Sequence, residues 1–383
     1  MDRVKIGLVG SGFAAALHME AYKQVYGIEP WVAAVASPSG QAGDFAREYG
    51  IPSVYRCMEE MIRKEQPDVV DICSPPSLHA PMIGSAMGAG CHVICEKPLT
   101  GWFGDSAEPD MAKKVMNQLE QLRRVVERSG RKFFYAENFI YAPAVQKSAS
   151  LIRAAGEHIL FMRGEESHSG SHAGHAALWS MNGGGSLIRQ GCHPLSALLY
   201  LKQLENGKGP EAVSVTADMG YIVPTLNEEE RKNIQARPKD VEDLANVILT
   251  FEDGTKALIT AGDMILGGVR NEIQVYTTGG VYQCRIAPSD QMTTYHVEDE
   301  KLSGQYFTEK VETKKGWQSI FLCEDMARGY VGELRDFLLC AAGRKGEPES
   351  GFSLAYDTVR IIYGAYCSAR EGRRIELSDT LWA

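Results

Sequence analysis

The sequence of 383 residues contains no apolar run of the roughly 20 residues that a membrane-spanning helix needs. It also lacks the N-terminal pattern of a secretory signal, because a strand-like run begins almost at the first residue. Clusters of lysine and arginine are missing, and the formal net charge of -9 gives no attraction for a nucleic-acid backbone. These absences argue against a membrane protein and against a nucleic-acid binder.

The sequence also lacks the pattern of paired cysteines. The nine cysteines are an odd number and lie singly along the chain, which is not the pattern of a disulfide framework. Cys91 and Cys95 flank a predicted buried strand with no second pair nearby, so we interpret them as core thiols. We expect a soluble, reduced, cytoplasmic protein, and the length favours two domains.

The first part of the chain alternates short apolar runs with helical patterns. Nearly continuous hydrophobic runs indicate strands that helices cover on both faces, as in a doubly wound parallel sheet. We therefore predict an α/β domain of the Rossmann type over residues 1–132. The predicted strands are 4–9, 31–36, 69–72 and 92–95, and the predicted helices are 17–25, 40–49, 58–64, 80–89 and 110–128.

From about residue 133 the pattern changes to strands separated by turn residues. Asp253-Gly254 between two such runs is a strong hairpin signal, so this sheet is predicted to be mainly antiparallel. We assign residues 133–383 to an α+β domain with a large open sheet, which serves substrate binding and oligomerisation. Its last helix, near 353–369, can pack back towards the first domain. The predicted strands are 159–165, 213–218, 244–251, 256–261, 272–277 and 281–286.

Residues 10–15 (GSGFAA) follow the first predicted strand and open a helix. Gly10 permits a tight turn, and Gly12 lets the backbone approach a pyrophosphate. Ala15 stands where a third glycine or alanine allows close packing of helix on strand. The helix N-terminus offers free N–H groups to phosphates, so we expect this turn, including Phe13, to bind a dinucleotide.

The second predicted strand ends in residues 35–39 (VASPS). An acidic residue here would indicate NAD and a nearby arginine would indicate NADP, but neither is present. Ser37 either binds the ribose 2′ position or only begins the next turn. We favour NAD as the cofactor, and NADP is not excluded.

Three segments, in order, resemble the Gfo/Idh/MocA family of NAD(P)-dependent oxidoreductases. Residues 73–79 (CSPPSLH) resemble its strand end before the nicotinamide half of the cofactor. Residues 89–99 (AGCHVICEKPL) resemble its hallmark strand ending in Glu-Lys-Pro. Residues 183–193 (GGGSLIRQGCH) resemble its glycine-rich turn before the active-site histidine. The resemblance runs from Val4 to about Leu377.

The resemblance implies a dehydrogenase that moves a hydride between a secondary alcohol of a sugar, glycoside or cyclitol and the nicotinamide. It also implies a homo-oligomer, either a dimer or a tetramer. Lys97 would act as acid/base or polarise the oxygen, which requires a lowered ammonium pKa. His193 titrates near neutrality and is the favoured proton acceptor. The cofactor contacts carried over from the family are Ser74, Pro75, His79, Glu96, Lys97 and Asn138.

One position departs from the family pattern. Many members have an aspartate four residues before the histidine, where this sequence has Arg189. An arginine cannot serve as a base. It either binds an anionic substrate through two hydrogen bonds or forms an ion pair with Glu165 or Glu166.

Three histidines lie close together at His168, His172 and His175. They either line the substrate pocket, have no special role, or bind a metal ion together with Glu166. We favour the substrate pocket, with His168 and His172 in it, and expect no metal. Two aromatic residues either line this pocket or fill the core, namely Tyr141 and Trp179.

Two other functions compete with a dehydrogenase. A redox-neutral lyase or glycosidase would use tightly bound NAD to form a keto-sugar intermediate, without net reduction of free NAD. A non-catalytic nucleotide-binding sensor would keep the fold and lose the chemistry, which the retention of Lys97 and His193 disfavours.

Overall fold

The structure is a computed structural model, which describes residues 2–171, 173–205, 211–287, 293–297, 300, 304–319, 321 and 323–378. Within these ranges, no helix is both long enough and apolar enough to cross a membrane. All nine cysteines are free thiols, and seven of them are buried.

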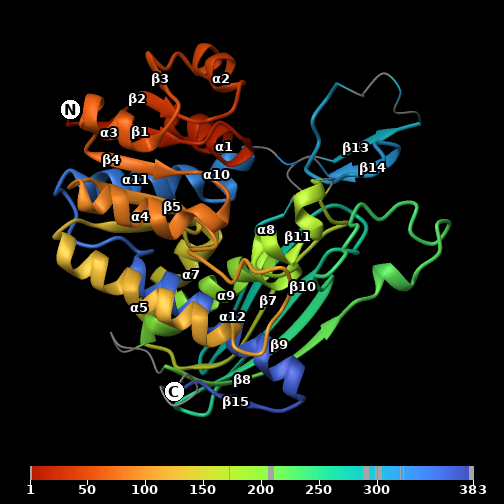
Figure 1. The fold of residues 1–383 in the computed structure, drawn as a ribbon. Helices are drawn as coiled ribbons and strands as arrows, with labels where there is room; N and C mark the ends of the chain where they lie inside the picture. The colour runs from red at the N-terminus through yellow and green to blue at the C-terminus, as the bar shows by residue number, and fades with distance from the viewer. Residues whose placement is uncertain are drawn as a thin grey trace.

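The first sheet consists of six parallel strands in the order β3-β2-β1-β4-β5-β6 (Figure 1). The strand order reverses between β1 and β4, which opens a crevice at the carboxyl ends of these strands, where such folds bind dinucleotides. All four residues of β4 are buried, as expected for a sheet covered on both faces. The strands are β1 (Arg3–Val9), β2 (Glu29–Ala36), β3 (Ser53–Tyr55), β4 (Val69–Ile72), β5 (His92–Glu96) and β6 (Phe133–Ala136).

Helices connect these strands as the sequence predicts. Two C-terminal helices, α10 (Glu324–Ala327) and α11 (Tyr330–Ala341), also join this domain, because both pack against α1 (Figure 1). The other helices are α1 (Phe13–Tyr22), α2 (Ala42–Tyr49), α3 (Met58–Glu65), η1 (Pro76–Leu78), α4 (His79–Gly88) and α5 (Met111–Ser129).

The first sheet extends beyond the predicted domain division at residue 132. Strand β6 pairs in parallel with β5, through Val93 with Phe133 to Glu96 with Ala136. The four residues of β6 are all buried, and such a short apolar run has no period that distinguishes strand from helix. We therefore propose a division after residue 136, with α10 and α11 added to the first domain.

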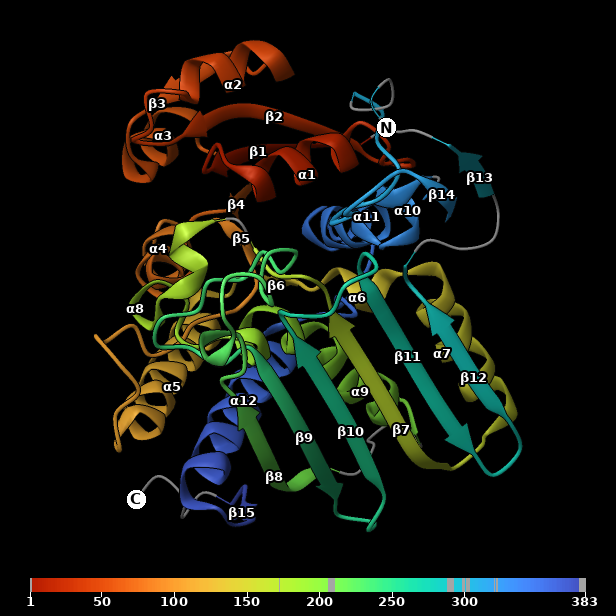
Figure 2. The ribbon, with the colours of Figure 1, turned by 90° about the vertical axis from the view of Figure 1, so that its right-hand side faces the viewer.

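The second sheet has seven strands in the order β12-β11-β7-β10-β9-β8-β15 (Figure 2). Only β7 and β10 are parallel neighbours, so the sheet is mostly antiparallel, in agreement with the prediction. Helices cover one face, and the other face is open. The strands are β7 (Ile159–Ser167), β8 (Ala212–Gly220), β9 (Leu244–Phe251), β10 (Lys256–Gly262), β11 (Arg270–Thr277), β12 (Val281–Arg285) and β15 (Ile375–Glu376). A separate ribbon joins β13 (Thr293–His296) to β14 (Gly316–Ser319).

The long helix α12 (Phe352–Glu371) contacts both domains. It packs against β8 and against α5 of the first domain, where the Tyr356 hydroxyl donates to Glu120 Oε1 at 2.6 Å. This position gives α12 contact with segments from both domains. The other helices of the second domain are α6 (Asn138–Tyr141), α7 (Pro143–Ala155), η2 (Gly174–Ala177), α8 (Trp179–Asn182), the π-helical turn η3 (Leu187–Gly191), α9 (Cys192–Gln203) and η5 (Val223–Thr225).

Candidate active site

The turn between β1 and α1 has the geometry of a phosphate cradle. Gly10 has φ of 106°, and a Cβ atom there would lie 2.5 Å from the carbonyl oxygen of Cys73. A Cβ at Gly12 would meet nothing within 4 Å, and no described side chain caps the first turn of α1. The free N–H groups and the open space above them fit the pyrophosphate of NAD. Phe13 is 72% exposed beside this turn, whereas Ala15 is fully buried against the sheet.

Ser37 ties the end of β2 to this turn. Its hydroxyl oxygen accepts from the Ser11 hydroxyl at 3.1 Å and from the Ser39 amide at 3.3 Å. Ser37 therefore stabilises the local turn, at the place where the adenosine ribose binds in folds of this type. No carboxylate or guanidinium interacts with it among the described residues.

A buried ionic chain holds Glu96 at the end of β5. His18 of α1 places Nδ1 2.8 Å from Asp71 Oδ2 and Nε2 3.2 Å from Glu96 Oε1. Carboxylate oxygens only accept, so both ring nitrogens carry protons and the ring is positively charged. Burial disfavours this charge, but Asp71 and Cys73 raise the pKa of His18 well above its ordinary value. Burial would also raise the pKa of Glu96, yet the charged His18 lowers it.

Lys97 joins the two domains. Its Nζ atom donates to the main-chain oxygen of Arg189 in η3 at 2.7 Å. A role as acid/base would need a lowered pKa of Lys97, and the structure corrects this expectation. Burial lowers the pKa of Lys97, but the nearby Cys192, Glu166 and other acidic groups raise it overall. Lys97 is therefore a charged donor, suited to polarise a substrate oxygen.

Both ring nitrogens of His79 have main-chain partners. Its Nδ1 atom lies 2.8 Å from the Pro98 oxygen, and its Nε2 atom lies 2.9 Å from the Ser74 oxygen. The side chain is fully buried, and burial lowers its pKa. His79 thus holds together the two loops that follow β4 and β5. Pro75 is exposed and immediately precedes η1.

His193 at the start of α9 is oriented by the carboxylate of Glu137. Its Nδ1 atom lies 2.6 Å from Glu137 Oε1, just after β6. The ring stacks on Phe139 with centroids 4.8 Å apart. Since Glu137 accepts the Nδ1 proton, the Nε2 lone pair is left available as a base. Glu137 thus supplies the carboxylate that the sequence lacks at position 189.

The glycine-rich turn before η3 wraps around the side chain of Glu242. This carboxylate accepts from the Gly185 and Leu187 amides, each at 2.9 Å, and from the Tyr366 hydroxyl at 2.9 Å. A Cβ at Gly185 would collide with Glu242, which explains the glycine. Burial raises the pKa of Glu242 to about 7.

A second tyrosine of α12 holds the same turn from the other side. The Tyr363 hydroxyl donates to the Gly183 oxygen at 2.8 Å and accepts from the Trp102 amide. Trp102 lies in the loop that follows Lys97. One hydroxyl therefore links the segment that carries Lys97 to the segment that leads to His193.

Arg189 is paired inside the protein with a residue that the sequence analysis did not select. Its guanidinium donates to both carboxylate oxygens of Asp263, at 2.9 and 3.2 Å. The predicted ion-pair partners Glu165 and Glu166 are therefore wrong. Gln190 also donates to Asp263. With its charge neutralised, Arg189 forms part of a wall and is not a free anion receptor.

His168 is the predicted pocket histidine that lies beside this ion pair. Burial lowers its pKa to about 4, so the ring is neutral. The Gly170 amide donates to its Nδ1 atom at 2.9 Å, which leaves Nε2–H as a fixed donor. Among the described residues, the groups close enough to share a metal ion include neither His168 nor His175. His172 lies outside the described residues.

Three further predicted contacts have internal partners. Trp179 is 1% exposed and donates to the Trp102 oxygen at 2.9 Å. The Tyr141 hydroxyl donates to Asp336 at 2.9 Å, and the Asn138 amide donates to the Arg328 oxygen at 2.9 Å. We therefore correct Trp179 and Tyr141 from pocket to core. Asn138 anchors the start of α11.

The sequence does not reveal Glu137 and Glu333 as site residues, and it offers Glu166 only as a metal ligand or an ion-pair partner of Arg189. Glu137 and Glu166 each keep one buried oxygen without a partner among the described residues. Burial raises the pKa of Glu166, and of Glu333 on α11 well above its ordinary value. The only sequence signal for Glu137 and Glu166 is their place immediately after, or at the end of, a strand, and Glu333 on α11 has no such signal.

Comparison with known families agrees with this geometry. Residues 4–128 match the model of the oxidoreductase family with an NAD-binding Rossmann fold. Residues 158–283 match the model of the GFO/IDH/MocA C-terminal domain. The chain belongs to the GFO/IDH/MocA family, and it is an NAD(P)-dependent oxidoreductase with an NAD-binding Rossmann domain.

Individual relatives share only a minor part of their residues with this chain. The D-apiose dehydrogenase of Paraburkholderia graminis is 23% identical, over 99% of this chain and 91% of the relative. The D-glucoside 3-dehydrogenase of Escherichia coli is 32% identical, over 32% of this chain and 33% of the relative. The structure of GenD2 from gentamicin A biosynthesis, in complex with NAD, superposes with a TM-score of 0.80 at 22% identity, covering 99% of this chain and 97% of that one. The scyllo-inositol dehydrogenase of Lactobacillus casei, with NAD(H) and scyllo-inositol bound, gives 0.74 at 18% identity, covering 98% and 99%.

Proposed function

We propose that the protein oxidises a secondary hydroxyl of a sugar, glycoside or cyclitol, with NAD as cofactor. The observation that carries this proposal is the pairing of His193 with Glu137, next to the charged Lys97. Arg189, whose oxygen binds Lys97, precedes His193 by four residues on a continuous helical segment. Lys97 and His193 both lower the pKa of Glu96 and both oppose the raised pKa of Glu166, which supports a common location for the base and the charged donor.

The roles follow from protonation states. His193 Nε2 takes the hydroxyl proton while Glu137 holds Nδ1 and stabilises the resulting imidazolium. One N–H of the Lys97 ammonium donates a hydrogen bond to the Arg189 oxygen. Another N–H points at the substrate oxygen, where negative charge develops. NAD, when bound, supplies the acceptor for the hydride. Glu96, fixed by His18, is positioned for the nicotinamide ribose. Gly10 and Gly12 admit the pyrophosphate.

A panel of sugars, glycosides, inositols and sugar acids tests the proposal, with NAD or NADP and the absorbance of the reduced nicotinamide as readout. We expect stoichiometric reduction of the cofactor by the substrate. Lys97→Met should lower kcat by about 100-fold or more, because charge stabilisation in the transition state is lost. Substrate consumption without reduced cofactor would instead establish the redox-neutral lyase or glycosidase. Binding of NAD without any turnover on the panel would favour the nucleotide-binding sensor.

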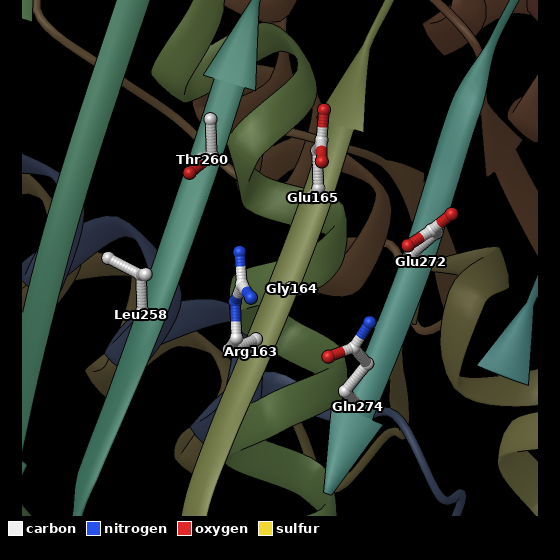
Figure 3. Close-up of a pocket in the computed structure, with 7 residues that line it drawn as sticks. All are labelled: Arg163, Gly164, Glu165, Leu258, Thr260, Glu272 and Gln274. Atoms are coloured by element: carbon white, nitrogen blue, oxygen red, sulfur yellow. The ribbon is translucent and has the colours of Figure 1, made fainter. Parts of the chain in front are cut away.

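We also propose that the open face of the second sheet joins two copies of the chain. Figure 3 shows Arg163, Glu165 and Glu272 side by side on β7 and β11, together with Thr260 on β10. Arg270 forms an ion pair with Glu165 at 3.5 Å on this face. Partly exposed charges of both signs suit a polar, self-complementary interface. Light scattering of wild type and of Glu165→Arg tests this: the variant should shift the protein from dimer or tetramer towards monomer.

A further inference from the structure

A cavity of about 160 Å³ lies beside the candidate active site. Arg189 and Asp263 form one wall, and the remaining walls come from residues 173–177 and 235–238. None of the roles assigned above to Lys97, His193 or the cofactor cradle uses this cavity. It is a separate space next to the reacting groups.

The walls of this cavity are firmly built. The Gln235 and Ala236 amides both donate to the Ser169 oxygen, at 2.7 and 3.0 Å. The Lys239 amide donates to the Ala177 oxygen at 3.1 Å, which closes the other side. Gly170, with φ of 101°, allows this close approach, because a Cβ there would collide with Ala236. Two segments about 65 residues apart in sequence are therefore held together around a preformed space.

The size and lining of the cavity identify the kind of group it suits. A cavity of about 150 Å³ is known to hold one six-membered ring. Ala176, Ala177 and Pro238 offer apolar surface. The Arg189–Asp263 pair offers charged donors and acceptors, and Gln235 Oε1 is buried without a partner among the described residues. A sugar ring has apolar faces and a rim of hydroxyls, and it matches this mixture.

Arg189 contacts both this cavity and Lys97. Its main-chain oxygen binds Lys97, while its guanidinium forms the cavity wall. His168 lies in the same region, because both Asp263 and Arg189 act on its pKa. Arg189 thus borders both the cavity and the Lys97 side chain, and a two-ring substrate would reach past this one residue.

We propose that this cavity is a second-ring pocket, which binds the non-reacting ring of a disaccharide or glycoside while the other ring is oxidised at Lys97 and His193. The inference rests on the proposed dehydrogenase function. It narrows the substrate class from sugars in general to two-ring compounds.

The first test compares kcat/KM for disaccharides and aryl glycosides with that for the parent monosaccharides. In Gln235→Leu, we expect kcat/KM for two-ring substrates to fall about tenfold, since a hydroxyl loses its acceptor. The value for monosaccharides should not change. Folding should not suffer, because the substitution removes a buried oxygen that has no partner. Gln203→Leu, at an exposed position of α9, is the matched control.

A second variant adds a large side chain to the lining of the cavity, at the exposed Gly174. A Cβ at Gly174 meets nothing within 4 Å, so Gly174→Leu can be accommodated. It should exclude two-ring substrates and leave monosaccharide oxidation intact. Equal effects on both substrate classes, or no effect in either variant, would overturn the second-ring pocket.

Failure of the dehydrogenase itself is distinguishable, because then no polyol reduces the cofactor. In that case calorimetric titration of the NADH-loaded protein with disaccharide and with monosaccharide decides the point. Binding of disaccharide that Gln235→Leu weakens supports the pocket, and equal binding of both sugars overturns it.

Discussion

Glu137 Oε1 lies 2.6 Å from His193 Nδ1, although 56 residues separate the two in sequence. The carboxylate comes from the end of the last strand of the first sheet, and the histidine comes from the first turn of α9 in the second domain. The family pattern that the sequence resembles has an acidic residue four positions before the histidine, where this chain has Arg189. The structure supplies the same orienting group from a different element, so the departure at 189 does not remove the base.

The first prediction concerns this pair. Glu137→Gln should lower kcat by about 100-fold or more, because an amide can present N–H groups to Nδ1 and stabilise the wrong tautomer. The affinity for NADH, followed by its fluorescence, should be unchanged.

Glu252→Gln, an exposed substitution on the hairpin after β9, is the control for Glu137→Gln and should leave kcat unchanged. A kcat within twofold of wild type in Glu137→Gln would show that Glu137 does not orient the base. A loss of NADH binding in Glu137→Gln would instead assign Glu137 to the cofactor site.

The second prediction concerns His18. His18→Gln leaves Asp71 and Glu96 without their buried cation, which should cost about 3–5 kcal/mol of unfolding free energy at neutral pH. The folded pKa of His18 lies above the ordinary value of 6.5. Its stabilising contribution is therefore complete below about pH 6.5 and is lost as pH rises through the raised pKa.

Urea unfolding of wild type and His18→Gln at several pH values measures this. The gap between the two proteins should narrow at alkaline pH, and the affinity of wild type for NAD should fall there. A gap that stays constant across the series would contradict a charged His18.

The third prediction concerns Glu242, whose folded pKa of about 7 exceeds its ordinary value of 4.5. The stability that follows from the bound proton is complete below about pH 4.5 and is lost as pH rises through 7. Glu242→Gln stays neutral throughout. Its unfolding free energy relative to wild type should therefore rise with pH over this window, by about 3 kcal/mol. Parallel stability curves for the two proteins would refute this.

The fourth prediction concerns the ion pair between Arg189 and Asp263. Arg189→Met alone leaves a buried carboxylate unpaired and should cost about 3–5 kcal/mol. The double variant Arg189→Met/Asp263→Asn should cost clearly less than the sum of the two single variants. Denaturant unfolding of the four proteins gives the coupling free energy. Additive costs would mean that the pair contributes nothing.

The fold was largely predictable because its signals are local. Gly10 marks a turn that needs positive φ, and the run before it can only be a buried strand. The Asp253-Gly254 hairpin fixed the antiparallel neighbours β9 and β10. Strand β6 was missed because four apolar residues carry no period. Its membership in the first sheet depends on pairing with β5, which is a tertiary property.

The site was predictable only in part, for a different reason. Lys97 and His193 stand in motifs that a single segment reveals. The partners of His193 and Arg189 are not revealed in this way, because Glu137 and Asp263 lie 56 and 74 residues from the groups that they bind. For Trp179 the sequence leaves pocket and core open, because an aromatic residue near a glycine turn suits either. Its burial and its hydrogen bond to Trp102 distinguish the two.

The contact between Lys97 and residue 189 is made through the main chain, so no particular side chain encodes it. Residue 189 can therefore be exchanged, together with its partner Asp263, without taking away the lysine's acceptor, as long as η3 keeps its backbone. This separates two properties that are coupled in many enzymes. The lining of the neighbouring cavity can change at positions 189 and 263 while Lys97 keeps its place, which makes this pair of positions a natural first choice for a saturation library.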